Sequence, residues 1–185
     1  TLTEKLGTLE ITENAAEVTF TAPSAVKTYD GTPLTASAVT AEGLPDGFTF
    51  SAETSGSQTD AGSSANTVSS YVIRNGDGKD VTDTFTKIKL ADGTLTVEPV
   101  KATVRTGSAS KSYDGTPLTS TEASITGLVN GETATVTATG TITEVGTAEN
   151  TYSITWGTAK EGNYVLAEET GTLEVTKNST EITFT

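Results

Sequence analysis

The sequence contains no cysteine, no methionine and no histidine. Without cysteine the chain can form no disulfide framework and has no thiol nucleophile. Without histidine it lacks the side chain that most often serves as a general base. Long apolar runs are missing too, since none approaches the roughly 18 residues of a membrane-spanning helix. These absences argue against an enzyme, against a disulfide-stapled scaffold and against membrane insertion of this fragment.

Apolar residues are also scarce, at 34% of the chain, compared with roughly 45–50% in ordinary globular domains. We therefore expect a thin hydrophobic core. Threonine supplies roughly one residue in five, and its β-branched side chain suits the half-exposed surface of a strand. The composition predicts an all-β protein with little or no helix.

Positive charge is limited to 11 lysines and arginines against 24 acidic residues, which gives a net charge of −13. Nucleic acids and anionic membrane surfaces are bound through clustered lysine and arginine. We therefore expect no nucleic-acid partner. The simplest role of the acidic surplus is to keep the protein soluble.

The dominant feature of the sequence is a repeat. Lys27–Thr35, which reads KTYDGTPLT, returns as Lys111–Thr119, which reads KSYDGTPLT, 84 residues later. A second motif, Gly-Thr-Leu, begins at Gly7, Gly93 and Gly171 and closes each repeat. A period of this length is too long for a solenoid unit and fits a small independent domain.

These motifs divide the chain into four parts. We expect residues 1–12 to be the last strand of a preceding repeat, and 13–98 and 99–177 to be two complete repeats. Residues 178–185, whose sequence matches the start of the first repeat, should be the first strand of a following one. Proline at the short junction after Glu98 stiffens the connection, so we expect an elongated tandem and a monomer.

Period-two alternation and turn residues predict the strands of the first repeat. We expect strands at 18–21 and 25–29, interrupted by Pro23, then an Asp-Gly turn at 30–33 and a strand at 34–41. The turns at 43–47 and 127–131 end in Asp-Gly and Asn-Gly, which are strong hairpin signals.

The later strands follow the same logic. We expect them at 48–50, at 81–90 and, in the second repeat, at 133–139. One extra residue between Ser69 and Tyr71 restores the alternation of the most apolar strand, so we expect a β-bulge there.

The motifs resemble the Tyr-Asp-Gly type of bacterial immunoglobulin-like repeat, the MBG-like repeats of surface proteins in Gram-positive bacteria. The resemblance rests on the two Tyr-Asp-Gly motifs, on the Gly-Leu turns, on Asn163-Tyr164 and on the Gly-Thr-Leu closers, and it covers nearly the whole chain. Phe85 departs from the pattern, because it occupies the slot that Tyr164 fills in the second repeat.

This resemblance implies two tandem immunoglobulin-like β-sandwich domains that serve as a non-catalytic spacer or stalk in an adhesin-like, extracellular, cell-wall-anchored structural protein. The implied partners are neighbouring repeats of the same chain. An alternative is a module that binds a carbohydrate or a host glycoprotein through its loops. The family implies no catalytic residues, no cofactor and no metal site, and we expect none.

Two segments nevertheless carry residue types that could do chemistry. Asn75–Asp80 (NGDGKD) has the alternating oxygen ligands of a calcium loop, but it lacks the later bidentate glutamate and includes Lys79. A glycine-rich hairpin tip is the more economical interpretation. The first repeat carries this segment and the second lacks it, so a ligand site unique to one repeat would most plausibly lie there.

Lys27, Asp30 and Asn66 recur as a set in the second repeat, as Lys111, Asp114 and Asn150. A lysine, an asparagine and a buried carboxylate are the residue types of an isopeptide cross-link. Asp30 and Asn66 can equally serve in turns, and Lys27 can guard a sheet edge. We predict no cross-link.

Trp156 shares a strand face with Tyr152 and Ile154. It could offer a stacking platform for a sugar ring, but its phase points towards the core, and we expect it to be buried between the sheets.

Overall fold

The computed structural model describes residues 7–10, 12 and 14–181. The chain divides into two compact units. The first consists of Thr1–Lys27, Pro33–Gln58 and Ser63–Thr96, and the second of Val97–Thr185 together with Thr28–Thr32 and Thr59–Gly62. The second unit therefore includes two short segments that the sequence repeat assigns to the first copy.

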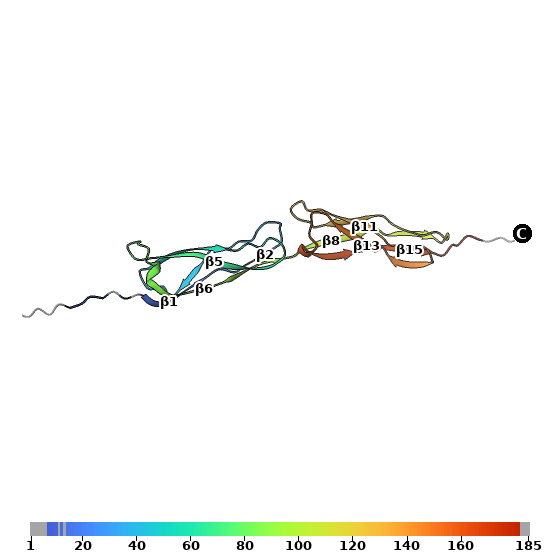
Figure 1. Ribbon diagram of the computed structural model, residues 1–185. Coiled ribbons are helices and arrows are strands. Elements are labelled where there is room, and N and C mark those ends of the chain that lie inside the picture. The colour runs from blue at the N-terminus through green and yellow to red at the C-terminus, as the bar shows by residue number, and fades with distance from the viewer. Residues whose placement is uncertain (1–6, 11, 13, 182–185) are drawn as a thin grey trace, which may run out of the picture. The chain divides into compact units, whose positions relative to one another are not determined.

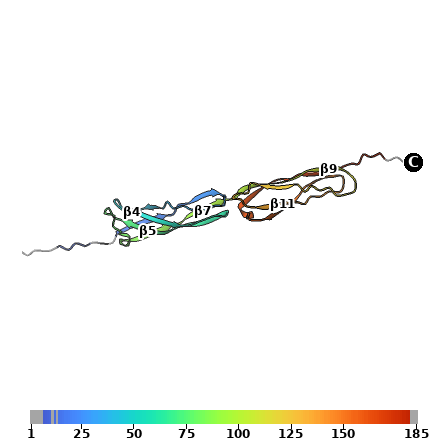
Figure 2. The same ribbon diagram turned by 90° about the horizontal axis from the view of Figure 1, so that it is seen from above.

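The first copy forms two sheets, of three strands in the order β3-β1-β6 and four strands in the order β2-β7-β5-β4. Its strands are β1 (Asn14–Thr21), β2 (Ala25–Thr28), β3 (Thr40–Glu42), β4 (Thr49–Ser55), β5 (Gly62–Arg74), β6 (Phe85–Ala91) and β7 (Gly93–Glu98), with a 3₁₀ turn η1 (Thr82–Thr84) before β6. Figure 2 shows β4, β5 and β7 in one layer of this copy. The pairing of β1 with β6 is parallel, while that of β4 with β5 is antiparallel.

The second copy repeats this arrangement, with sheets ordered β10-β8-β14, β12-β15-β9 and β11-β13 (Figure 1). Its strands are β8 (Val100–Thr106), β9 (Ala109–Ser112), β10 (Ala123–Thr126), β11 (Ala134–Ala138), β12 (Gly146–Glu149), β13 (Tyr152–Trp156), β14 (Tyr164–Glu169) and β15 (Thr172–Thr176), with a 3₁₀ turn η2 (Glu161–Asn163) before β14. The counterpart of the single strand β5 is interrupted here at Asn150 and becomes β12 and β13.

The prediction of an all-β fold with little helix is confirmed. Regular helix in the described residues is limited to the two 3₁₀ turns, and none of the described helices is long and apolar enough to span a membrane. In the first unit Val18 and Phe20 of β1 pack with Val68 and Ile73 of β5 in one buried cluster. Because β1 and β5 belong to different sheets, this core joins the two layers of a β-sandwich.

Alternation explains which side chains enter the core. In β8, Ala102, Val104 and Thr106 are buried while the intervening residues are more exposed, and in β15 Leu173 and Val175 are the buried pair. Such alternation is expected where one sheet face meets a core and the other meets water.

The glycine of each Gly-Thr-Leu closer is required by a close approach of two backbones. A Cβ atom built on Gly93 would overlap the carbonyl oxygen of Pro23, and one built on Gly171 would overlap that of Gly107. Only a residue without a side chain fits at this spacing. The motif that closes each repeat in the sequence is thus the place where β7 or β15 begins against the first strands of its own copy.

The predicted bulge and the turn residues are largely confirmed. In the pairing of β4 with β5, Glu53 faces Ser70 and Thr54 faces Val68, so Ser69 is the extra residue. Pro23 separates β1 from β2, and the strand at 133–139 is found as β11. Residues 82–84 form a 3₁₀ turn, so the strand predicted at 81–90 begins only at Phe85.

Two predictions about the middle of the first repeat are wrong. Residues 35–39 of the expected strand 34–41 form no strand, because the chain crosses between the sheets here: Leu34 bridges to Gln58 and Thr40 already pairs with β1. The turn at 43–47 likewise connects β3 to β4, which lie in different sheets, so it is not a hairpin, and the same holds for the turn at 127–131 between β10 and β11. The turn itself forms, with Phe48 N–H donating to the Pro45 carbonyl at 3.2 Å.

The predictions for both ends fall largely on residues outside the description. Residues 7–10 and 12 of the expected strand 1–12 carry no strand, and residues 1–6 and 11 lie outside the described residues. Residues 178–181 of the expected final strand are likewise without strand structure, and 182–185 lie outside the described residues.

Candidate functional site

The Tyr-Asp-Gly motif forms the predicted turn. The carboxylate of Asp30 accepts hydrogen bonds from the backbone N–H of Thr32 at 2.9 Å and from its hydroxyl at 2.7 Å. Gly31 has a φ of 78°, the left-handed conformation that favours glycine. Turn geometry therefore explains the aspartate, the glycine and the threonine of the motif.

The second copy has the same turn with a lysine on it. Asp114 accepts from the N–H and hydroxyl of Thr116, and the Lys111 ammonium donates to Asp114 Oδ1, Thr116 O and Thr116 Oγ1, each at 2.7 Å. The Lys111 ammonium and the two Thr116 donors hold the pKa of the Asp114 carboxyl well below its usual range. Lys111 thus clamps the turn from the sheet-edge strand β9.

Asn66 and Asn150 do something the sequence reasoning missed. Both are fully buried, and Asn66 lies inside β5, so the expected turn role is wrong for it. The amide NH₂ of Asn66 donates to the carbonyls of Pro23 at 2.8 Å and Ala36 at 2.9 Å. Asn150 makes the equivalent bonds in its own copy, at 2.8 and 3.1 Å.

The other side of each amide faces a glycine. The oxygens of Asn66 and Asn150 are buried and have no hydrogen-bond partner among the described residues. A Cβ atom built on Gly56 would come within 2.6 Å of Asn66 Oδ1, and one on Gly140 would do the same to Asn150 Oδ1. The amide orientation follows from the two carbonyls, because a reversed amide would place its oxygen against both of them.

These contacts show where the lysine, aspartate and asparagine considered for an isopeptide cross-link lie. In the second copy Lys111 and Asp114 meet in the turn, whereas the Asn150 amide is committed to the backbone carbonyls of Gly107 and Ser120. The lysine amine and the asparagine carboxamide are therefore each held by other partners. The arrangement is that of two separate structural clamps.

A cluster of hydrogen-bonded polar and aromatic side chains lies in the second unit, around the side chain of Tyr29. The Glu132 carboxylate accepts from the Tyr29 hydroxyl through one oxygen and from the Tyr164 hydroxyl, at 2.6 Å, through the other. The rings of Tyr29 and Tyr164 meet edge to face with centroids 5.9 Å apart, and Trp156 stacks on Tyr164 at 6.0 Å. We call these four residues the tyrosine socket.

A polar rim lies beside the tyrosine socket. Asn163, which is buried, accepts from the N–H of Ala61 at 2.7 Å and donates to Asp60 Oδ1 at 3.1 Å. Lys160 donates to the second oxygen of Asp60 at 2.6 Å. The hydrogen bonds from Lys160 and Asn163 lower the pKa of Asp60. We call Asp60, Ala61, Lys160 and Asn163 the rim.

The pKa shifts indicate that Tyr29 and Tyr164 act as hydrogen-bond donors. The hydrogen bond to Glu132, burial and the nearby negative charge raise the pKa of Tyr29 to about 12. Burial and the same carboxylate also raise the pKa of Tyr164. Both phenols therefore stay protonated far above neutral pH and can donate to Glu132 throughout the physiological range. Such a site can hold a turn in place.

The prediction that Trp156 is buried between the sheets is wrong. Trp156 is half-buried, because it lies at the end of β13 and stacks on Tyr164 outside the sheet-to-sheet core. Tyr152 and Ile154, on the same face, are half-buried as well. The aromatic face is used within the second unit and is not a separate platform.

The Asn75–Asp80 segment is a hairpin tip in the structure. The side-chain oxygen of Asn75 accepts from the N–H groups of Asp77 at 3.1 Å and Lys79 at 2.9 Å. Asp80 accepts from the N–H and hydroxyl of Thr82, which starts η1. The oxygens are thus used in shaping the turn, and no group of three or more metal-binding side chains occurs in the described residues.

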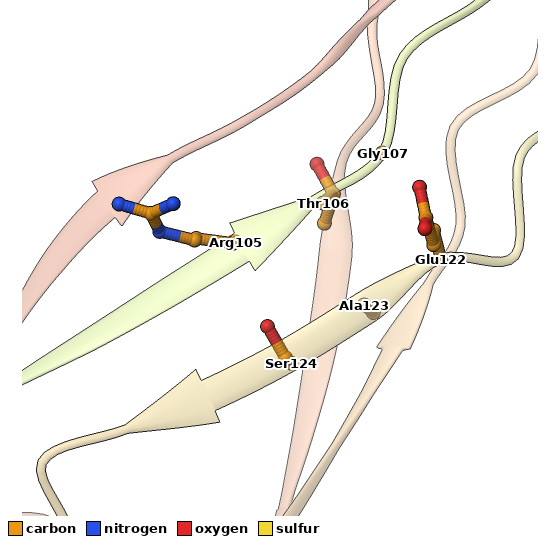
Figure 3. Close-up of a pocket in the computed structure, with 6 residues that line it drawn as sticks. All are labelled: Arg105, Thr106, Gly107, Glu122, Ala123 and Ser124. Carbon is orange, nitrogen blue, oxygen red and sulfur yellow. The ribbon is translucent and has the colours of Figure 1, made fainter.

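A hollow with a volume of about 410 Å³ is lined by residues of β8, β10 and their adjoining loops. Figure 3 shows Arg105 and Glu122 on either side of Thr106. Arg105 pairs with Glu169 at 2.5 Å, and the Thr106 hydroxyl bridges the Asn150 carbonyl and the Gly171 N–H. Two side chains that line the hollow, Arg105 and Thr106, are therefore engaged by the fold itself.

Sequence reasoning singled out the Tyr-Asp-Gly motif and Asn163-Tyr164, and the structure joins Tyr29 of the first motif to Tyr164. It missed Glu132, Lys160 and Asp60. Nothing in the sequence marks Glu132, since the first copy has Phe48 at the equivalent position, 84 residues earlier. One sequence signal could have indicated a polar site here. Asn163 and Tyr164 both carry hydrogen-bonding side chains at the start of a strand, where such groups are not required for strand formation.

Residues 102–174 match the family model described as the MBG domain (YGX type). Comparisons with curated proteins and with solved structures give no match. The matched segment runs from β8 to β15 and so spans the second copy. The MBG family is one of surface-protein repeats. The resemblance to MBG-type repeats that the Tyr-Asp-Gly motifs predicted is thereby confirmed over residues 102–174.

Proposed function

We propose that the chain is a pair of non-catalytic spacer repeats of an extracellular, cell-wall-anchored, adhesin-like protein. One observation carries the proposal: the tyrosine socket is filled by the chain's own Tyr-Asp-Gly turn. Its phenols and carboxylate hydrogen-bond one another, so the conspicuous motif of the sequence serves architecture.

The rest of the chemistry supports the same function. The chain has no histidine or cysteine, and the raised pKa values of Tyr29 and Tyr164 and the lowered pKa of Asp60 arise from burial and hydrogen bonds within the tyrosine socket and its rim. A surplus of acidic residues disfavours nucleic acid and anionic membranes. The repeats act as a monomer whose partners are neighbouring repeats of the same chain.

Binding assays separate a spacer from a recognition module. The chain is applied to a glycan array and to immobilised mucin, and we expect no binding up to millimolar free glycan. The matched variant replaces residues 74–84 with 157–163, the shorter connection between the equivalent strands of the second copy. Binding by the parent that this graft abolishes would overturn the spacer proposal in favour of carbohydrate or glycoprotein recognition by the first copy's loop.

Localisation is tested separately. Intact cells of the source organism are labelled with a membrane-impermeant biotin reagent. We expect the protein that contains this chain to be labelled while a cytoplasmic control protein is not. Labelling only after lysis would contradict the proposed position on the cell wall.

A further inference from the structure

The two Tyr-Asp-Gly turns are built alike but differ in what covers them. Tyr29 N–H donates to the Glu98 carbonyl at 2.7 Å and Tyr113 N–H to the Thr176 carbonyl at 2.8 Å, so each turn is anchored to the end of its closing strand. Tyr29 is 4% exposed in the tyrosine socket. Tyr113 is only half-buried, and its hydroxyl makes no hydrogen bond among the described residues.

The rim shows the same contrast. The repeat offset places Glu144 and Val145 where the first copy has Asp60 and Ala61. Glu144 keeps the carboxylate that Lys160 and Asn163 bind at Asp60. Glu144 is exposed, and Val145, a large apolar residue, is 47% exposed. The second copy therefore presents a tyrosine, a carboxylate and an apolar side chain together.

The side chains that can bind such a tyrosine, carboxylate and apolar residue occur in only one of the two copies. Where the second copy has Glu132 and Tyr164, the first has Phe48 and Phe85, whose rings pack edge to face at 5.6 Å. Phe85 follows η1 as Tyr164 follows η2, which places Thr84 at the position of Asn163. The first copy thus lacks the carboxylate and the amide that hold a Tyr-Asp-Gly turn.

We propose that Tyr113, Glu144 and Val145 form a docking surface for a further repeat of the second copy's type. That repeat would carry equivalents of Glu132, Lys160, Asn163 and Tyr164. The tyrosine hydroxyl donates to the incoming glutamate, the Glu144 carboxylate accepts from the lysine and the asparagine amide, and the apolar Val145 is covered. The inference rests on the proposed spacer function and adds a rule to it: a repeat with the phenylalanine pair does not fit this surface.

Such an interface is heterologous, because the turn surface of one repeat meets the socket of the next. It therefore specifies order along an array. A socket-bearing repeat follows a Tyr-Asp-Gly turn, and a phenylalanine-bearing repeat is accepted only by a different surface. The near-identity of Lys27–Thr35 and Lys111–Thr119 fits this, because both turns enter the same kind of socket.

The test is an extended chain: residues 1–176 followed by a second copy of 99–177, which reproduces the connection after Glu98. The added copy carries Tyr113→Phe, so that each chain has a single Tyr113. Both chains are treated with tetranitromethane, and nitration of Tyr29 and Tyr113 is followed by peptide mass spectrometry. We expect Tyr113 to react about tenfold more slowly in the extended chain, the ratio that corresponds to docking favoured by about 1.4 kcal/mol. Tyr29 should react slowly in both chains.

The matched control gives the added copy the first copy's residues, by Glu132→Phe, Asn163→Thr and Tyr164→Phe in that copy alone. Protection of Tyr113 should disappear. Far-UV circular dichroism, whose strand signal should grow in proportion to the added residues, shows that the added copy is folded. Equal nitration of Tyr113 in the parent and extended chains would overturn the docking surface, and so would protection that survives the control. An added copy that stays unfolded also counts against it. Failure here with no glycan binding leaves the spacer function standing.

Discussion

The hydroxyl of Tyr29 donates a hydrogen bond to the carboxylate of Glu132, a residue 103 positions later in the chain. The contact lies within the second compact unit, which includes Thr28–Thr32. Because Tyr164 donates to the other oxygen of the same carboxylate, one glutamate satisfies two buried phenols. A charged acceptor makes both hydrogen bonds stronger than neutral ones.

The first prediction concerns pH. Tyr29 has its pKa raised to about 12 from an ordinary 10.0, so its protonated form is favoured by the folded state. The stabilisation is complete below pH 10 and is lost as pH rises through 12. We expect the free energy of unfolding to fall between pH 10 and 12, with Tyr29 ionising late when tyrosinate absorbance is followed.

Glu132→Gln should move the ionisation of Tyr29 back towards 10, because the charge is removed while an acceptor remains. Glu168→Gln is the matched control: Glu168 raises the pKa of Tyr152 to about 12 through an equivalent hydrogen bond. This control should lower the late ionisation of Tyr152 and leave that of Tyr29 unchanged. An unaltered Tyr29 titration in Glu132→Gln would contradict the socket.

The second prediction concerns the closing glycine. Gly171→Ala places a methyl group on the carbonyl oxygen of Gly107, so the backbones must separate. We expect a loss of about 1–3 kcal/mol or more in unfolding free energy, measured by chemical denaturation. Gly162→Ala, where a Cβ meets nothing within 4 Å, should stay within about 0.5 kcal/mol. Equal effects of the two changes would show that the close approach is not what the motif preserves.

The sequence patterns correctly predicted those features that depend on neighbouring residues. The Asp30 turn, the bulge at Ser69 and the alternation in β8 follow from backbone geometry and from one buried face per strand. These features need only a few neighbouring residues, and the sequence repeat shows each of the turns twice.

The features that were missed depend on partners far away in the sequence. The segment after Leu34 alternates well enough for a strand, but it crosses between sheets because Gln58 and β1 take its two ends. Asn66 sits near glycine and was expected in a turn, yet the carbonyls it binds come from Pro23 and Ala36. Propensity cannot reveal such contacts, since tertiary pairing decides them.

The third prediction concerns covalent chemistry. The ammonium of Lys111 is held by the Asp114–Thr116 turn, and an exposed carboxylate of lowered pKa stays ionised, whereas isopeptide formation needs a protonated acid beside a neutral amine. We expect the intact mass to equal the sequence mass. A mass lower by one ammonia, restored by Lys111→Ala, would prove the cross-link.

The last prediction concerns the buried amides. Asn150→Ala leaves the carbonyls of Gly107 and Ser120 without their donor, which costs about 1–3 kcal/mol for each unsatisfied buried group. Asn150→Asp should cost more at neutral pH, because a carboxylate would face those two carbonyls. Its stability should recover partly as pH falls, since burial without donors raises an aspartate's pKa and protonation restores one donor. Unfolding free energies from pH 4 to 8 measure this, with Asn178→Ala as the exposed control. A pH-independent Asn150→Asp variant as stable as the parent would mean that the amide's two hydrogen bonds contribute nothing to the fold.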